Sequence, residues 1–201
     1  MAKHNRDHLH AVFGRWWRAL NDTRDDGARG DRADRADIAR LRRVSTFTTD
    51  LGPRVDVASA LTIAAFRDLY RRVGMDGTVE QDERLVVAAV TLAHVRADAP
   101  GRQTAQLLAG PDSDHKLMAE SRFLRLLRVG SPAELMDEGR RIAALLRTGA
   151  PVADLGASLM VWLDDPERRR LWAQAYYGLG ASPSPSESPS ERQPETGVPL
   201  S

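Results

Sequence analysis

The chain has 201 residues, of which 42% are hydrophobic, and this suits one or two small domains with a buried core. It contains no cysteine, which excludes disulfides, thiolate metal sites and thiol nucleophiles. The formal net charge is only +1, although 27 of the 29 basic residues are arginine, whose planar fork suits phosphate and carboxylate groups. A GC-rich genome would explain much of this arginine excess, but not the positions of the arginines.

The apolar residues occur in short runs. No run reaches the roughly 18 apolar residues that a membrane span requires, so none is expected. Residues 1–17 also lack the apolar core and small-residue cleavage site of a secretion signal. We therefore expect a cytoplasmic protein with no membrane contact.

Helical periodicity runs through most of the chain. Residues 5–21 place large apolar side chains on one face, which predicts an amphipathic helix. Residues 79–97 are apolar enough to predict a central buried helix, whereas 45–54 are expected to form a loop. No strand-like alternation is found. The predicted fold class is therefore all-α, a compact bundle of about eight or nine helices, and the other helices are expected over 31–44, 55–73, 102–109, 116–128, 132–149, 151–163 and 166–178.

Serine and proline mark one helix start with particular clarity. Ser131 is expected to cap a helix that begins at Pro132, and Glu134 is expected to close a capping box. Asp165 followed by Pro166 predicts a second start of this kind.

Composition also divides the chain into parts. The "GPDSD" segment at 110–114 is expected to separate an N-terminal bundle, residues 1–110, from a C-terminal bundle, residues 111–180. Residues 181–201 are rich in serine, proline and glutamate and have little apolar content, so they are expected to be disordered.

Metal-binding and hydrolytic sites find little support in the sequence. His4 and His8 have a spacing that can ligate zinc, with His10 close by, but no third ligand is evident. Asp112 and Asp114 could be paired carboxylates, although acids just before a helix usually act as caps. No phosphate-binding glycine loop or nucleophile motif is found. We therefore expect no metal, no cofactor and no enzymatic activity.

The large aromatic residues cluster toward the two ends of the sequence. At helical spacing such residues usually belong to the core, and base stacking is the alternative. The residues concerned are Trp16, Trp17, Trp162, Trp172, Tyr176 and Tyr177.

Arginines are arranged in clusters on three predicted helices. In "ESRFLRLLRVG", residues 120–130, they recur at every third position and form one stripe that backs onto a Phe and Leu face. Similar clusters occur in "ARLRRV" and "GRRIAALL", and in the latter Asp137 and Glu138 lie three residues before the arginines and can pair with them. A solvated face is one explanation for any single cluster. Three clusters that line one groove would instead bind a nucleic-acid backbone without reading its sequence.

The order of these motifs resembles that of the CasB family, the small subunit of the type I-E CRISPR surveillance complex, Cascade. The resemblance covers about residues 10–178 and rests on "WWRAL", "LRRV", "AFRDLY", "ESRFLRLLR", "GRRIAALL" and "WLDDPERRRLWAQAYY" in this order. It implies an all-helical, non-enzymatic subunit, present in two copies between the crRNA-binding backbone subunits and the large subunit. It also implies contact with the guide–target region and the displaced DNA strand, which stabilises the R-loop.

The resemblance also implies which residues bind nucleic acid. The alternatives are a purely structural adaptor, whose arginines pair with acidic partner proteins, and a hydrolase that uses Asp112 and Asp114. The implied nucleic-acid-binding residues are Arg42, Arg43, Arg122, Arg125, Arg128, Arg140 and Arg141.

Overall fold

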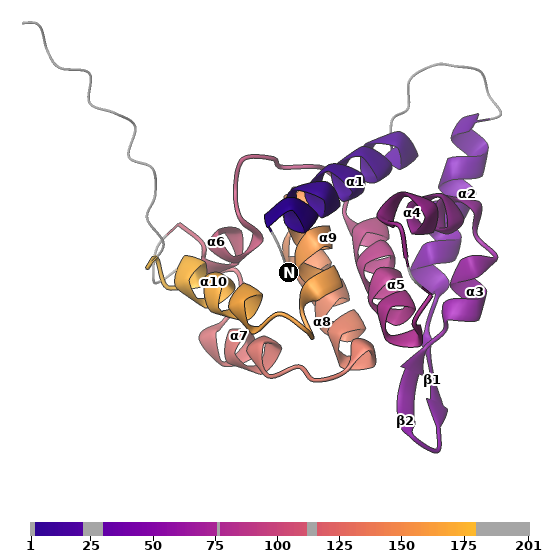
Figure 1. The fold of residues 1–201 in the computed structure, drawn as a ribbon. Coiled ribbons are helices and arrows are strands. Elements are labelled where there is room, and N and C mark those ends of the chain that lie inside the picture. The colour runs from indigo at the N-terminus through magenta and orange to yellow at the C-terminus, as the bar shows by residue number, and fades with distance from the viewer. Residues whose placement is uncertain (1–2, 22–29, 76, 112–115, 180–201) are drawn as a thin grey trace, which may run out of the picture.

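The computed structural model describes residues 3–21, 30–75, 77–111 and 116–179. These residues form ten helices and one short hairpin (Figure 1), so the predicted all-α class is confirmed. The elements are α1 (Lys3–Asn21), α2 (Gly30–Arg43), β1 (Thr46–Thr49), β2 (Gly52–Val55), α3 (Val57–Leu61), α4 (Ala64–Val73), α5 (Val79–His94), α6 (Thr104–Ala109), α7 (Glu120–Leu127), α8 (Pro132–Leu145), α9 (Val152–Val161) and α10 (Pro166–Tyr176).

Helix α5 is the centre of the fold. Its residues 85–93 are all buried, and both α8 and α9 pack against it, while α1 packs against α9 (Figure 1). A helix with neighbours on most sides has no polar face, which explains its run of Val, Ala and Leu. The predicted central helix is confirmed. It ends at His94 rather than at residue 97, because the chain then hydrogen-bonds through Ala97 and Ala99 to Ala150.

Residues 46–55 form an antiparallel hairpin that protrudes from the helical body (Figure 1), so the expectation of a loop without strands is wrong. Gly52, with a φ of 106°, allows the chain to reverse. At its base, Arg54 Nε (2.7 Å) and the Val55 N–H (3.1 Å) both donate to Glu83 Oε1 of α5. Only Val55 of the strand residues is fully buried, so the alternation typical of a half-buried strand is missing from the sequence.

The single helix predicted over 55–73 is two helices. Asp56 caps α3, and Ile63 then adopts an extended conformation with its side chain buried before α4 begins. The start of α4 is held by Asp37 of α2, whose Oδ2 accepts the Ala65 N–H at 2.9 Å. This break depends on a cap from a distant residue, which local periodicity does not reveal.

The tryptophans are core residues, as predicted. Trp16 and Trp17 of α1 are buried, and their indole N–H groups donate to backbone carbonyls of α4 and α5 at 2.9 and 3.1 Å. Trp162 and Trp172 are also buried and pack edge to face, with ring centroids 4.8 Å apart. Tyr177 differs, because it is 41% exposed. The indoles of Trp16 and Trp17 therefore hold α1 against α4 and α5.

Helices from both halves of the sequence share one buried cluster, since α1 packs against α9 and α5 packs against both α8 and α9. The division into bundles over 1–110 and 111–180 stays a prediction. The predicted disordered tail, 181–201, and the aspartates Asp112 and Asp114 lie outside the described residues. Within the described ranges, no helix combines the length and apolar character needed to cross a membrane.

Candidate functional site

Helix α7 holds the arginine stripe of the 120–130 stretch at the surface. Phe123 and Leu126 are fully buried on its inner side, and the Phe123 ring stacks on Tyr176 of α10 with centroids 3.9 Å apart. Because the inner side is fixed in the core, the opposite side faces solvent. That side carries the three predicted arginines, all of them exposed: Arg122, Arg125 and Arg128.

The beginning of α7 differs from the prediction over 116–128. The helix starts at Glu120, because the preceding chain is held against α6, where the Met118 N–H donates to the Leu108 carbonyl at 3.0 Å. Glu120 is the acidic residue of α7, in the first turn of the helix that carries the arginine stripe. It accepts a hydrogen bond from the Tyr177 hydroxyl at 2.8 Å, and it forms no ion pair among the described residues.

Helix α8 begins where the sequence predicts. Ser131 Oγ accepts the Glu134 N–H at 3.3 Å, and Pro132 occupies the first turn. The predicted capping box is not formed, because the Glu134 carboxylate accepts the Gly130 N–H at 3.1 Å instead. The helix ends at Leu145 rather than at residue 149, since the chain then turns to pair with the segment after α5.

Glu138 of α8 brings two predicted site arginines together. Its side chain is 5% exposed, and its Oε1 lies 2.6 Å from Arg141 Nη1 and 3.2 Å from Arg125 Nη2. The predicted local pair with Arg141 is confirmed, whereas the contact with Arg125 comes from α7. The arginine side chains remain 47% and 60% exposed, respectively. These three residues are called the Glu138 cluster below.

Two other predicted arginines bind backbone carbonyls. Arg42 Nε donates to the Ala93 carbonyl in the last turn of α5 at 2.7 Å, and Arg140 Nη2 donates to the Val44 carbonyl just after α2. A cation at the carbonyl end of a helix stabilises that end. Burial lowers the pKa of His94 from its usual 6.5, and the charges of Arg42 and Arg140 lower it further. His94 is therefore mainly neutral near pH 7.

Consecutive arginines of α8 contact two neighbouring parts of the fold. Its consecutive residues Arg140 and Arg141 reach in different directions, the first to the end of α2 and the second to the Glu138 cluster on the α7 side. Arg140, Arg141 and Arg125 therefore form a series of contacts from the end of α2 through α8 to α7. Three predicted arginines are exposed, and their side chains form no hydrogen bond or ion pair with any described residue: Arg43, Arg122 and Arg128.

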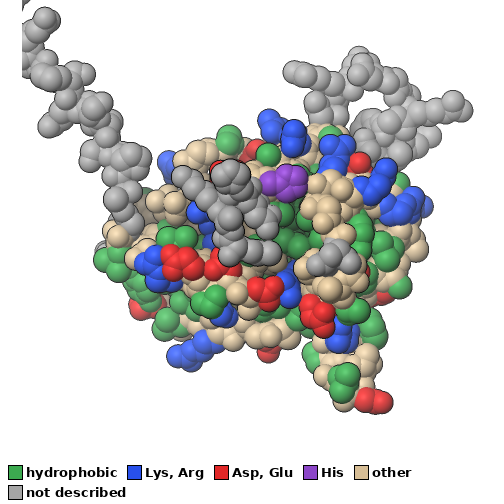
Figure 2. Space-filling model, in the orientation of Figure 1, with side chains coloured by type: hydrophobic (Ala, Val, Ile, Leu, Met, Phe, Trp, Pro, Cys, Tyr) green, Lys and Arg blue, Asp and Glu red, His purple; other side chains and the backbone are tan. Residues whose placement is uncertain are grey.

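A second group of exposed arginines lies on α1 and α4 and was not predicted from the sequence. Arg15 and Arg18 of α1 and Arg67 and Arg71 of α4 are exposed, and each donates to a nearby backbone carbonyl. None of the four pairs with a carboxylate in the described part of the chain. Figure 2 shows basic side chains along the upper edge of the molecule, over α1 and α4. Their spacing of three and four residues was visible in the sequence and could have revealed them.

Arg168 of α10 is used in the interior. Its guanidinium donates to Asp154 Oδ1 and to Ser158 Oγ, both at 2.9 Å. Asp154 Oδ2 also accepts the N–H and the hydroxyl of Thr104, at 2.8 and 2.7 Å, and Ser158 Oγ accepts the Trp172 indole N–H at 3.1 Å. This buried network joins α6, α9 and α10, so Arg168 has a structural role.

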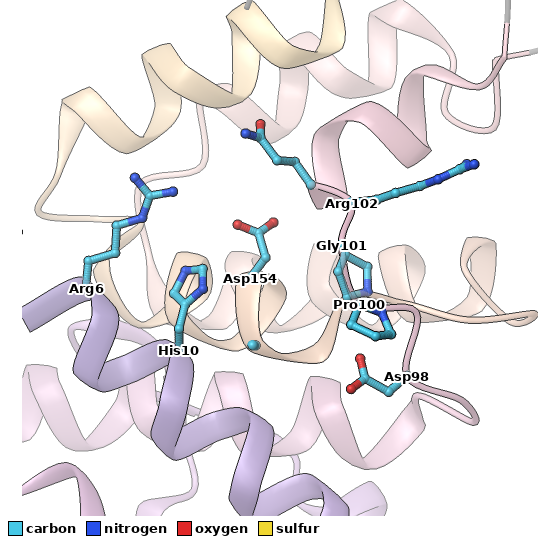
Figure 3. A pocket seen from close by; sticks show the side chains of 10 residues that line it. Arg6, His10, Asp98, Pro100, Gly101, Arg102 and Asp154 are labelled. Atoms are coloured by element: carbon cyan, nitrogen blue, oxygen red, sulfur yellow. The ribbon is translucent and has the colours of Figure 1, made fainter. Parts of the chain in front are cut away.

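A cavity of about 270 Å³ lies beside this network, at the start of α1 and α9 (Figure 3). Arg6, His10 and Arg102 line it together with Asp98 and Asp154. Burial is the main cause that lowers the pKa of His10 below 6.5. Asp98 accepts the first backbone N–H of α9, and Asp154 is saturated by the network described above. Both carboxylates thus hold the fold together and do not form a free catalytic pair.

The described residues contain no candidate metal site, because no three His, Asp or Glu side chains are grouped closely enough to hold an ion. His8 is exposed, and the side chain of His4 lies outside the described part. The fold and the surface together define a small, mainly helical protein with exposed arginines that meet between α7 and α8.

The chain belongs to the Cse2 family, because the family of the CRISPR-associated protein Cse2 matches residues 37–177. This is the CasB family, the small subunit of type I-E Cascade, so the resemblance found in the sequence is confirmed. Family membership implies other Cascade subunits as partners. The match includes every residue of the Glu138 cluster and excludes α1. No curated protein and no solved structure matches the chain.

Proposed function

We propose that this chain is a non-catalytic small subunit of type I-E Cascade that contacts crRNA, target DNA and the displaced strand and thereby stabilises the R-loop. The supporting observation is the Glu138 cluster, in which arginines from two helices meet at one carboxylate while their guanidinium groups stay exposed. Guanidinium groups suit phosphate oxygens. The proposed contact residues are Arg42, Arg43, Arg122, Arg125, Arg128, Arg140 and Arg141.

The proposed contact is to the phosphate backbone. Base pairing by the guide RNA reads the sequence, while the protein holds the strands in place. Arg42 and Arg140 already bind carbonyls, so they contribute less than the arginines of α7 and Arg141. Because the net charge is small, affinity depends on the assembly with the large subunit, the backbone subunits and a second copy of this chain.

The first test is the double variant Arg122→Glu/Arg128→Glu in the reconstituted complex. Both side chains are exposed and unpaired among the described residues, so the fold should be retained. We expect target-DNA binding to weaken about tenfold for each lost contact. One hydrogen bond to a charged group contributes a binding free energy that corresponds to about this change in affinity. Unchanged R-loop formation in this variant would contradict the proposal.

A structural adaptor is the second candidate. The protruding hairpin exposes Phe47 (50%) and Leu51 (90%), which favours contact with a partner protein. In this case the arginines pair with acidic partner surfaces. Titration of the complex with single-stranded DNA at several salt concentrations distinguishes the two candidates, because counterion release gives a steep salt dependence. A flat response with intact assembly would support the adaptor.

A further inference from the structure

We infer that Glu138 is a positioning residue that holds Arg125 and Arg141 as a preformed pair for one phosphodiester group. The inference rests on the proposed function. It explains why a carboxylate, which repels phosphate, lies among arginines that are proposed to bind phosphate.

Glu138 lies at a buried position on α8. Its carboxylate is buried, and a buried charge is costly unless it is paired. Its partners are two arginines from α7 and α8, and both approach the same oxygen, Oε1. The other oxygen, Oε2, is buried without a hydrogen-bond partner in the described structure. Such groups are uncommon in proteins, so this one calls for an explanation beyond folding stability.

The ion pairs with Glu138 leave most N–H donors of Arg125 and Arg141 free. A guanidinium has five N–H donors, and each arginine directs only one nitrogen to Glu138. The remaining donors of Arg125 and Arg141 lie on side chains that are about half exposed. Without Glu138, two neighbouring cations would repel and their long side chains would sample many rotamers. One buried anion therefore brings two phosphate-binding groups close together and orders them.

Two explanations make opposite predictions for Glu138→Gln. If Glu138 only neutralises positive charge, its removal strengthens binding to nucleic acid. If Glu138 positions the arginines, its removal weakens binding, even though the protein gains one positive charge. Asp137→Asn is the matched control, because this substitution removes the same charge from the same helix. The Asp137 side chain is 61% exposed, and its Oδ1 lies 3.9 Å from Arg140 Nη1.

The experiment measures target-DNA affinity of the assembled complex for both variants. We expect Glu138→Gln to weaken binding about 2- to 12-fold for each arginine that must be ordered on binding. Asp137→Asn should leave affinity unchanged or raise it. Equal or tighter binding by Glu138→Gln overturns the inference, and thermal melting of both variants shows that the comparison concerns folded protein.

A third variant, Arg125→Ala/Arg141→Ala, separates positioning from general structure. If Glu138 acts through these arginines, then Glu138→Gln has no further effect in this background. A full additional loss would mean that Glu138 acts elsewhere, which overturns the inference alone. If Arg125→Ala/Arg141→Ala binds target DNA as tightly as the native complex, the proposed function of this surface fails first.

Discussion

Two arginine-containing regions of this protein use the same side chain in opposite ways. Arg168 is 5% exposed, and its guanidinium donates to Asp154 and Ser158 in the buried network of α9. Arg125 and Arg141 share one carboxylate and keep most of their donors at the surface. All three arginines lie in sequences with several arginines: Arg168 in "PERRRLW", Arg125 in "ESRFLRLLRVG" and Arg141 in "GRRIAALL". The number of arginines in a stretch therefore says little about its role, whereas burial and free donors separate structure from binding.

The comparison predicts the largest stability effect for Arg168→Ala. Removal of one partner leaves Asp154 buried without its counter-charge, which typically destabilises a protein by about 3–5 kcal/mol. Chemical denaturation measures this loss, and Arg169→Ala on the same helix is the control. A loss below about 1 kcal/mol for Arg168→Ala would show that the network is not structural.

A smaller effect is expected at the contact that supports the Glu138 cluster. A Cβ atom at Gly139 of α8 would lie 2.2 Å from Thr91 Oγ1 of α5, so Gly139→Ala forces the two helices apart. Overpacking of this kind costs about 1–3 kcal/mol in the free energy of unfolding. Addition of Thr91→Ala should restore most of the loss, and a strictly additive double variant would contradict the steric explanation.

The smallest effect concerns pH, since two half-buried histidines lie near arginines of the protein. Burial is the main cause that lowers the pKa of His10, near Arg168, and of His94, near Arg140, below 6.5. The unfolded chain then binds protons first as the pH falls through 6.5, so folded-state stability decreases toward acid. We expect His94→Gln to show a shallower decrease between about pH 7 and about pH 5.5 in urea denaturation. An unchanged pH dependence would rule out His94 as a contributor.

Local patterns predicted most of the helices, because a buried face recurs with helical periodicity in α1 and α7, and the apolar run of α5 indicates a buried helix. They could not predict the hairpin, since the carboxylate that fixes it, Glu83, belongs to α5. The contacts of the candidate site also differ in whether the sequence could predict them. The pair between Glu138 and Arg141 is local and was foreseen, whereas the contact with Arg125 depends on how α7 packs beside α8. Likewise, nothing in "LRRV" indicates that Arg42 binds a carbonyl of α5.

The most direct test of the account is the salt dependence of target-DNA binding by the complex carrying Arg122→Ala/Arg128→Ala. Each lost phosphate contact should reduce the slope of log affinity against log salt by about 0.7–0.9, so the account predicts a decrease of up to twice that amount. Arg67→Ala/Arg71→Ala on α4 makes the same change in net charge and is the control. An equal decrease in both variants, or no decrease in the first, would contradict a specific phosphate-binding role for α7.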